Sequence, residues 1–484
     1  MTNNSLINTL ATGVPGLDDV LGGGLPEYSF NLIAGPPGCG KTTLAHQMMF
    51  ALAAPERPAL YFTVLGEPPL KMLRYQQQFA FFDAQKINAS IHFINLSDVA
   101  VTGDLGAVLE KITEEVESRS PAFVFVDSFR SVVLSHKAPG DPYGELQRFV
   151  QHLGMLMTSW QATTFLIGEY FNETDANPVF TVADGLIWLR QSVQRNSMVR
   201  KLELLKMRGR PTMPGLHTFR IDGNGVHVFA PVGQRQPSTA AQIDRSAGQR
   251  LSIGVPDLDD MLGGGIPPGY SILVSGPSGS GKSLLAAAFL QEGARNGETG
   301  VIAMFEQQPV KARNEAVAAL IAADRVGVVD SRVPDLSVDE IVPLIVAEIA
   351  RLQATRVVID SLSGFELSLA PTFRADFREA LSRFVTALAD TGVTVLMTCE
   401  LEDRYTDLRF SPYGTAFLTD VIIVQRYIEM DSRLRRMMSV VKIRASAHSD
   451  QIRLFTIDDA GIKIGDTLEG LEGLMGGRPT HKRL

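Results

Sequence analysis

The chain has 484 residues, of which 45% are hydrophobic and 20% charged, and a formal net charge of −8. This length predicts two or three domains, and the composition is that of an ordinary globular protein. The acidic balance excludes a general attraction to nucleic acid or to an anionic membrane. Two cysteines cannot form a disulfide framework, the first residues lack the features of a signal peptide, and no apolar run approaches the roughly 20 residues of a membrane span. We therefore expect a cytoplasmic protein without a membrane partner.

The first motif follows an apolar strand expected at residues 29–34 and precedes a helical pattern at residues 43–51. It matches G-x-x-x-x-G-K-[ST], the P-loop, in which glycines let successive backbone N–H groups surround a phosphate at a helix N-terminus. We expect Lys41 to reach the β- and γ-phosphates as a binding and catalytic group, and Thr42 to bind Mg²⁺. The expected nucleotide-binding residues are Gly35, Pro36, Pro37, Gly38, Cys39, Gly40, Lys41, Thr42 and Thr43.

Cys39 occupies a variable position of this motif. One interpretation is a small side chain that fits the loop. The other is a redox-sensitive nucleotide site, because a thiolate can react with oxidants. The redox hypothesis predicts that oxidant lowers ATP binding and that Cys39→Ser abolishes this effect.

Further apolar strands, expected at residues 59–65, 91–95, 122–127, 163–168 and 185–189, alternate with longer helical patterns. Near-continuous apolar strands separated by crossovers predict a mainly parallel sheet with helices on both faces. Such sheets bind ligands beyond the carboxyl ends of their strands. Asp127 ends one of these apolar runs, the Walker B arrangement, in which a carboxylate holds Mg²⁺ through water. The alternative is an aspartate that only caps the next element.

Lys206 and Arg208 are two residues apart on a predicted strand, so their side chains leave from one face. One interpretation is a solvated strand face. The other is a pair of cationic fingers that reach the γ-phosphate bound by a neighbouring subunit, where Arg spreads over the charge and Lys acts as a point donor.

The whole pattern occurs twice. Residues 13–26 return as residues 254–267 with 11 of 14 positions identical, at an offset of 241 that also carries Lys41 onto Lys282. A period of this length indicates two complete domains. In the second copy, Ser283 and Asp360 are expected to bind Mg²⁺, and Lys442 and Arg444 to form the second pair of fingers. Its expected nucleotide-binding residues are Gly276, Pro277, Ser278, Gly279, Ser280, Gly281, Lys282, Ser283 and Leu284.

A polar stretch at residues 233–250 lacks periodicity and is interpreted as a linker. We therefore expect one P-loop domain over residues 1–232 and another over residues 251–466. The Gly-rich residues 467–484 are expected to form a flexible tail.

Hydrolysis also needs a group that orients or deprotonates water. After the second strand, the first half has Gly66 and Glu67, whereas the second half has Glu306 and Gln307. Aligned on the prolines that follow, Gly66 corresponds to Glu306 and Glu67 to Gln307. Each half keeps one carboxylate at a different position, so we expect unequal activity in the two halves.

Together these segments resemble the KaiC-like proteins, double-domain RecA-type ATPases named for the circadian clock protein. The resemblance covers about residues 10–465 and rests on the lead-in at residues 12–26, both P-loops, both Walker B aspartates and both Lys-x-Arg segments. It implies two tandem RecA-like domains and a slow ATPase that uses ATP and Mg²⁺. It also implies a homohexameric ring with ATP between subunits, contacted in trans by the fingers. We favour a signalling or regulatory ring ATPase whose nucleotide state controls binding of a protein partner.

Departures from the family's pattern leave two alternatives. The clock protein has adjacent glutamates after the second strand of each domain, and its Ser-Thr phosphorylation pair falls on Ala416 and Phe417, which cannot accept phosphate. A serine/threonine autokinase that uses Glu306 as base is one alternative, with a nearby Ser or Thr as acceptor. A DNA-acting motor is the other, which the acidic charge balance and the lack of an evident Lys/Arg-rich loop disfavour.

Overall fold

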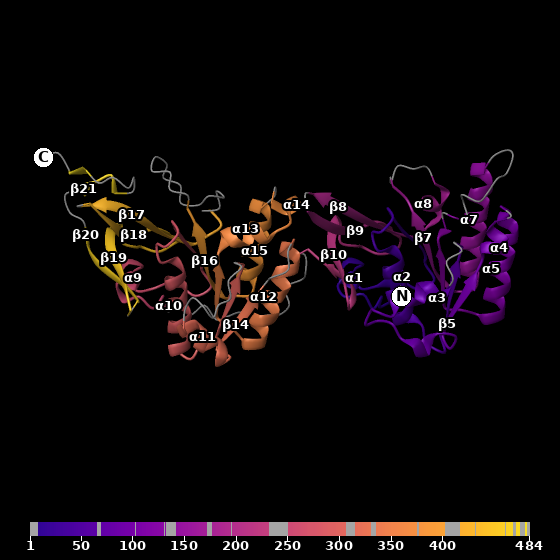
Figure 1. Cartoon of the computed structure of the whole chain (residues 1–484), viewed down its shortest axis with the longest axis horizontal. Helices are drawn as coiled ribbons and strands as arrows, with labels where there is room; N and C mark the ends of the chain where they lie inside the picture. Colours follow the sequence, from indigo (N-terminus) through magenta and orange to yellow (C-terminus); the bar gives the residue numbers. More distant parts are fainter. Residues whose placement is uncertain are drawn as a thin grey trace, which may run out of the picture. The chain divides into compact units, whose positions relative to one another are not determined.

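In the computed structural model the chain divides into two compact units, residues 1–231 and 232–484. Figure 1 shows the helices and strands of each unit. Glu67, Glu306 and most of the expected linker lie outside the described residues. The structure describes residues 8–64, 69–101, 103–129, 131, 142–171, 177–194, 196–231, 250–305, 315–330, 335–374, 377–401, 417–430, 432–459, 461–467, 471–474 and 480–481.

The first unit is built around one large sheet. Among its described residues this sheet has nine strands in the order β11-β10-β9-β8-β3-β7-β6-β4-β5. The strands from β8 to β5 in this order are parallel, whereas β8, β9, β10 and β11 pair antiparallel. The strands of the sheet are β3 (Phe30–Gly35), β4 (Ala59–Thr63), β5 (Ile91–Asn95), β6 (Phe123–Asp127), β7 (Thr163–Glu169), β8 (Gly185–Gln194), β9 (Ser197–Met207), β10 (Leu216–Asp222) and β11 (Gly225–Phe229).

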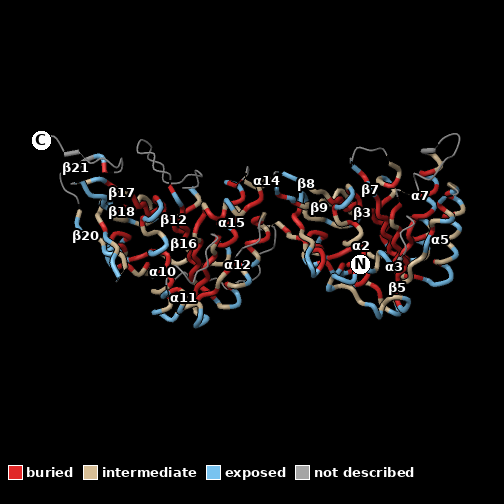
Figure 2. Tube along the Cα trace, viewed as in Figure 1, coloured by how far each residue is buried: buried red, intermediate tan, exposed pale blue. Residues whose placement is uncertain are grey.

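Helices cover both faces of this sheet. Helix α2 (Lys41–Leu52) packs in one core with Ile33, and α5 (Leu105–Arg119) and α7 (Pro142–Ser159) pack in a second core with Leu32. Adjacent strand residues point to opposite faces, so one buried strand supplies both cores. Figure 2 shows the buried residues concentrated along the strands and the inner sides of the helices. The other elements of this unit are β1 (Thr9–Leu10), α1 (Leu17–Val20), β2 (Leu25–Pro26), α3 (Pro69–Gln76), η1 (Ala84–Lys86), α4 (Ser97–Ala100) and α8 (Pro178–Val182).

The second unit repeats this arrangement. Its described sheet also has nine strands, in the order β14-β13-β15-β16-β12-β17-β18-β19-β20. Its strands are β12 (Ser271–Gly276), β13 (Gly300–Met304), β14 (Val326–Asp330), β15 (Arg356–Asp360), β16 (Thr394–Glu400), β17 (Val421–Met430), β18 (Arg433–Ile443), β19 (Ile452–Asp458) and β20 (Gly461–Thr467). Its helices are α9 (Pro256–Met261), α10 (Lys282–Arg295), α11 (Glu315–Ala322), α12 (Val338–Leu352), α13 (Leu362–Ser368), α14 (Pro371–Arg374) and α15 (Phe377–Asp390). Helix α10 covers one face, and α12 and α15 cover the other.

The predicted fold class, two tandem α/β domains with mainly parallel sheets covered on both faces, is confirmed. The six strands expected in the first half coincide with β3 to β8 at their starts to within one residue. Within the expected tail, β21 (Leu471–Glu472) pairs with β22 (Thr480–His481), and Leu474 packs with Ile428 and Met437. In the part of the chain that the structure describes, no helix is long and apolar enough to cross a membrane.

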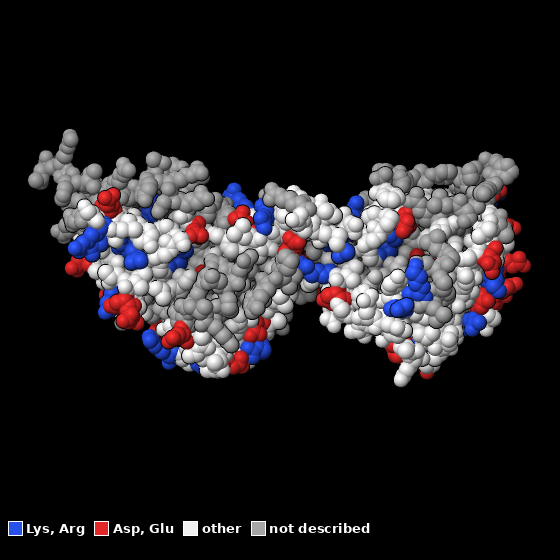
Figure 3. Space-filling view, viewed as in Figure 1, with Lys and Arg blue, Asp and Glu red and all other residues white. Residues whose placement is uncertain are grey.

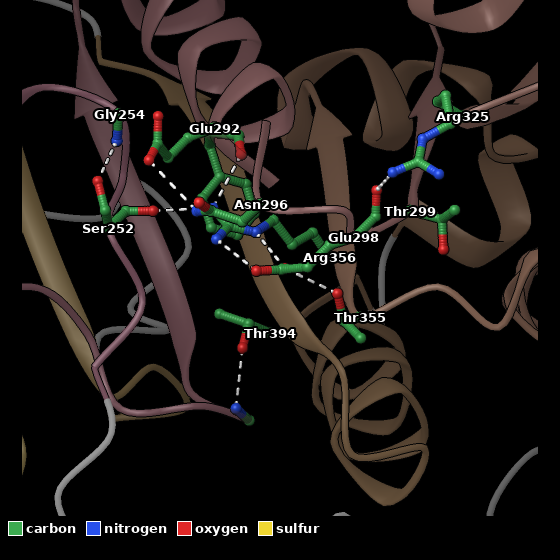
Figure 4. Close-up of polar contacts among 12 residues, drawn as sticks. Ser252, Gly254, Glu292, Asn296, Glu298, Thr299, Arg325, Thr355, Arg356 and Thr394 are labelled. Carbon is green, nitrogen blue, oxygen red and sulfur yellow. Dashed lines mark hydrogen bonds and ion pairs between the residues drawn. The ribbon is translucent and has the colours of Figure 1, made fainter. Parts of the chain in front are cut away.

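A buried ion pair anchors the amino-terminal end of β15 (Figure 4). Only 1% of the Arg356 side chain is exposed, and its Nε lies 2.7 Å from Oε2 of Glu298. Arg356 Nη1 also donates to the carbonyl oxygens of Ser252 (2.8 Å) and Phe289 (2.9 Å). A buried charge needs such partners to offset its desolvation. The cluster therefore joins the lead-in segment of the second unit to α10 and β15.

Candidate functional site

The first P-loop connects β3 to α2 at the carboxyl edge of the sheet. Gly38 and Gly40 have φ angles of 73° and 105°, a left-handed backbone that favours glycine. A Cβ on Gly40 would also lie only 2.5 Å from Cδ1 of Ile221. Among the described residues no side chain caps the N-terminus of α2 or of α10, so the first backbone N–H groups of each helix are open to an anion.

Both P-loop lysines fold back over their own loops. Lys41 Nζ donates to the carbonyl oxygens of Gly35 (3.0 Å) and Pro36 (2.9 Å). Lys282 Nζ makes the two equivalent bonds at 2.9 and 2.8 Å. Each ammonium is thus held beside the backbone amides that would surround a phosphate, where it can donate charge-assisted hydrogen bonds.

Asp127 lies at the end of β6, and two hydroxyl groups donate to its Oδ2. Thr42 Oγ1 is 2.9 Å away and the Tyr61 hydroxyl 2.7 Å away. Burial raises the pKa of Asp127, although the hydrogen bonds from Tyr61 and Thr42 and the charge of Lys41 oppose this rise. Burial and the Asp127 charge also raise the pKa of Tyr61, so the neutral phenol is the donor. The two residues expected to bind Mg²⁺ in the first half are therefore direct neighbours.

Asp360 of the second unit is held from a different strand. Thr398 Oγ1, on β16, donates to Asp360 Oδ1 at 2.6 Å. By strand register, Thr398 corresponds to Ile167 in the first unit, and Tyr61 corresponds to Ile302 in the second. Ser283 and Leu284 are exposed at the start of α10. The two units thus keep the Walker B aspartate but change the hydroxyl that supports it.

A cavity of about 460 Å³ opens at the P-loop of the first unit. It brings together residues that are far apart in the sequence, and among them are two cations and two carboxylates. Its lining includes Gly38, Gly40, Lys41, Thr42, Thr43, Thr63, Met72, Asp127, Ser128, Glu169, Arg200 and Ile221. The mixture of glycine backbone, hydroxyls and opposite charges suits a polyphosphate with a divalent cation.

The Lys-x-Arg fingers lie away from the P-loop of their own unit. Lys206 Nζ donates to the carbonyl oxygen of Thr181 (2.9 Å), and Arg208 Nη1 lies 3.2 Å from Oδ1 of Asp184. The other carboxylate oxygen of Asp184 accepts a hydrogen bond from the backbone N–H of Phe30, the first residue of β3. Since the P-loop leaves the opposite end of β3, about 16 Å away at the rise of a β-strand, these fingers are beyond the reach of their own loop.

The second unit repeats this placement. Lys442 Nζ donates to the carbonyl oxygen of Thr419 (2.6 Å), and Arg444 Nη1 lies 3.2 Å from Oδ1 of Asp420. Asp420 in turn accepts from the backbone N–H of Ser271, the first residue of β12. The arginine of each pair is therefore held by an aspartate that also accepts a hydrogen bond from the first residue of the strand leading to the P-loop.

Cys39 is completely buried, and burial raises the pKa of its thiol, although the charge of Lys41 opposes this rise. A protonated buried thiol reacts slowly with oxidants, which favours the interpretation of Cys39 as a small side chain that fits the loop. The expected water-orienting residues Glu67 and Glu306 lie outside the described residues.

Sequence reasoning missed four supporting residues: Tyr61, Thr398, Glu169 and Arg200. Tyr61 had a usable signal, because a tyrosine inside a fully apolar strand needs a partner for its hydroxyl. Glu169 had one as well, since it ends an apolar strand as Asp127 does. Arg200 lines the cavity from β9, and nothing in its local sequence distinguishes it from a solvated arginine.

Comparison with known proteins agrees with this geometry. A sequence model of the KaiC ATPase family matches residues 10–233 and again residues 251–469. The chain belongs to the KaiC ATPase family. It is 27% identical to the circadian clock oscillator protein KaiC of Rippkaea orientalis over 490 residues, which cover 98% of this chain and 92% of the relative. It is also 27% identical to the protein of that name from Nostoc sp. over 496 residues, covering 99% of this chain and 93% of the relative.

Membership of the KaiC family implies ATPase activity and nucleotide binding. The residues at the first site fit a nucleotide with Mg²⁺, because open backbone amides, Lys41, Thr42 and the Asp127 carboxylate meet at one cavity. The described residues contain no group of three or more His, Cys, Asp or Glu side chains that could hold a metal ion.

Proposed function

We propose that this KaiC family member is a Mg²⁺-dependent ATPase with one nucleotide site in each unit. The observation that carries the proposal is the cavity in which Lys41, Thr42 and Asp127 meet. Lys41 and Lys282 bind the β- and γ-phosphates; Thr42 and Ser283 ligate Mg²⁺, and Asp127 and Asp360 hold it through water. Mg²⁺ neutralises charge on the transferring phosphoryl group. Glu67 and Glu306 stay candidates for the group that activates water.

We further propose that the fingers act on a neighbouring subunit of a ring. The support is their distance from their own loops. Lys206 and Arg208 lie at the start of β3 while the P-loop leaves its end, so any γ-phosphate that they contact is bound by another unit, and we assign that role to a neighbouring subunit. Lys442 and Arg444 are placed alike at the start of β12. A homohexamer, as the family resemblance implies, satisfies this requirement with closed symmetry.

The first experiment measures mass by light scattering with and without Mg-ATP, and ATP hydrolysis on the same samples, for the wild type, Lys41→Ala and Lys282→Ala. We expect a hexamer that depends on nucleotide and hydrolyses ATP slowly. A monomer at every nucleotide concentration contradicts the ring and the trans-acting fingers.

A mixing experiment tests the fingers directly. In a Lys282→Ala background, the Lys41→Ala chain has intact fingers and no working first site, whereas the Arg208→Ala chain has an intact first site and no Arg finger. Trans action predicts that mixing the two poorly active proteins restores hydrolysis. The restored interfaces are those at which the intact first site of the Arg208→Ala chain meets the intact fingers of the Lys41→Ala chain. Activity equal to the sum of the separate proteins contradicts trans action.

We propose that nucleotide state controls binding of a signalling protein partner. Pull-down with the chain held in ATP or ADP tests this, and equal partner recovery in both states contradicts it. The alternatives make separate predictions. An autokinase predicts phosphate between residues 411 and 419 in peptide mass spectrometry after incubation with ATP. A DNA motor predicts tight, salt-sensitive DNA binding, which the mixture of basic and acidic side chains on the face of each unit drawn in Figure 3 disfavours.

A further inference from the structure

We propose that Glu169 and Glu400 are catalytic carboxylates that orient the attacking water in the first and second sites. This inference rests on the proposed ATPase function and names residues of the same sites. Glu169 lines the nucleotide cavity together with Lys41, Thr42 and Asp127. The Glu169 charge is also close enough to contribute to the raised pKa of Asp127.

Sheet order places each glutamate between the P-loop strand and the Walker B strand of its own unit. Glu169 ends β7, which lies between the P-loop strand β3 and the Walker B strand β6. Glu400 ends β16, which lies between β12 and β15. The carboxyl ends of parallel strands meet at one edge, so each glutamate stands beside the loop that binds the γ-phosphate and the aspartate that holds Mg²⁺.

Register confirms that the two glutamates are equivalent. Glu169 is paired with Gly35 and Glu400 with Gly276, the first glycine of each P-loop. This is unlike Glu67 and Glu306, which stand at different positions of the two halves. A carboxylate at the same place in both units can perform the same step in both.

The backbone fixes each glutamate against its P-loop. The N–H of Tyr170, directly after Glu169, donates to the carbonyl oxygen of Gly35 at 3.2 Å, and the N–H of Leu401 donates to that of Gly276 at 3.1 Å. The same carbonyl of Gly35 accepts from Lys41 Nζ. Each glutamate is thus attached to the element that binds phosphate, and both glutamates are exposed to solvent.

In the reaction, the water oxygen forms a bond to the γ-phosphorus while the bond from that phosphorus to the bridging oxygen breaks, and its electron pair leaves on ADP. The glutamate accepts a hydrogen bond from the water, takes its proton and releases it to solvent. Positioned acid–base groups of this kind contribute about 10²- to 10⁴-fold to rate.

The test uses the full chain with one site disabled. Glu169→Gln is made in a Lys282→Ala background, and Glu400→Gln in a Lys41→Ala background. Glu67→Gln is the rival variant in the first series, and Glu114→Gln, a change at an exposed position of α5, is the matched control. Turnover, Mg-ATP affinity and the pH–rate profile are measured for each, together with Glu169→Asp, which retains the charge on a shorter side chain.

We expect Glu169→Gln to lower turnover about 100-fold, with Mg-ATP affinity changed less than about threefold and the acidic limb of the pH–rate profile lost. Glu169→Asp should give an intermediate rate, and Glu114→Gln the parental rate. Unchanged turnover in Glu169→Gln overturns the inference and leaves the proposed function intact, above all if Glu67→Gln is inactive. Loss of Mg-ATP binding in Glu169→Gln also overturns it, because that result indicates a structural role. A parent chain that hydrolyses no ATP overturns the proposed function and this inference together.

Discussion

The two halves present the same groups to the nucleotide but support them with different residues. In the first half, Tyr61 on β4 holds the Walker B aspartate, whereas in the second half Thr398 on β16 does so. Both strands flank the aspartate strand, so a hydroxyl from either side can reach the carboxylate. The two halves thus share the residues that face phosphate, while the hydroxyl that supports the aspartate comes from a different neighbouring strand in each.

A second difference lies at the opposite end of each sheet. In the first half, Arg57 lies over the ring of Phe123, 5.0 Å from its centroid, and pairs with Glu27. Strand register puts Arg356 at the position of Phe123, so the cation has moved from the loop into the strand. Gly293 makes this exchange possible, since a Cβ there would lie 2.7 Å from the Arg356 side chain.

The largest effect is expected from the P-loop lysines, where the halves are alike. Lys41→Ala and Lys282→Ala should each weaken ATP binding to their own half about 100-fold, because each removes charge-assisted hydrogen bonds worth about 3 kcal/mol together. Titration with a fluorescent ATP analogue measures this. Unequal losses would show that the two loops bind phosphate differently, despite their matching geometry.

The next effect is confined to the second half. Arg356→Leu should destabilise it by about 2 kcal/mol, because Glu298 loses its partner. Burial alone would raise the pKa of Glu298, but its bonds to Arg356 outweigh burial and lower it. A carboxyl with a lowered folded-state pKa stabilises the fold above its unfolded pKa and loses this contribution as pH falls through the folded value.

Hydrogen exchange of second-unit peptides in urea, at neutral and acid pH, measures the destabilisation by Arg356→Leu. The difference in unfolding free energy between the variant and the wild type should disappear at acid pH. Arg57→Leu is the matched control in the first half, where an exposed side chain predicts a loss below about 1 kcal/mol. An equal loss of stability in both variants would mean that the buried Arg356 stabilises its unit no more than the exposed Arg57 does.

A smaller effect is expected at the Walker B supports. Tyr61→Phe, in a Lys282→Ala background, should raise the Mg²⁺ concentration for half-maximal hydrolysis about fivefold, since one hydrogen bond to a carboxylate is lost. The pKa of Asp127 should also rise further. As the pH is lowered, the variant should therefore lose activity at a higher pH than its parent does. Thr398→Val should have the matching Mg²⁺ effect in a Lys41→Ala background.

Tyr75→Phe, at an exposed position, is the control for the loss of a tyrosine hydroxyl. A Tyr61→Phe chain with the parental Mg²⁺ dependence would mean that Thr42 alone is enough to hold Asp127.

The smallest effect is expected at Cys39. Its counterpart Ser280 donates to Oε1 of Gln425 at 2.9 Å, whereas Cys39 is buried in the hydrophobic core with its Sγ 3.9 Å from Lys41 Nζ. Cys39→Ala should change ATP affinity less than about twofold, and oxidant sensitivity should be the same in Cys39→Ser as in the wild type. Oxidant sensitivity that disappears in Cys39→Ser would restore the redox hypothesis.

The fold and the phosphate-facing residues followed from the sequence because each depends on local signals. Apolar runs of five or six residues predict buried parallel strands, and glycine spacing predicts the loop between β3 and α2. Tyr61, Thr398 and Glu169 could not be paired with their sites in this way. Their roles depend on which strands are neighbours, and strand order is set by crossovers that the sequence does not display. The antiparallel strands β10 and β11 were missed since they alternate polar and apolar residues over short runs.

The carboxylate of Asp184 joins two tasks in one side chain. One oxygen fixes the start of the strand that leads to the chain's own P-loop, and the other holds the guanidinium of Arg208. Within the proposed ring, a small shift of β3 when a site fills would pass through this carboxylate to the proposed finger at the next interface. Each subunit would then receive a signal from one side and send it to the other, so information about occupancy would travel around the assembly in a single rotational sense.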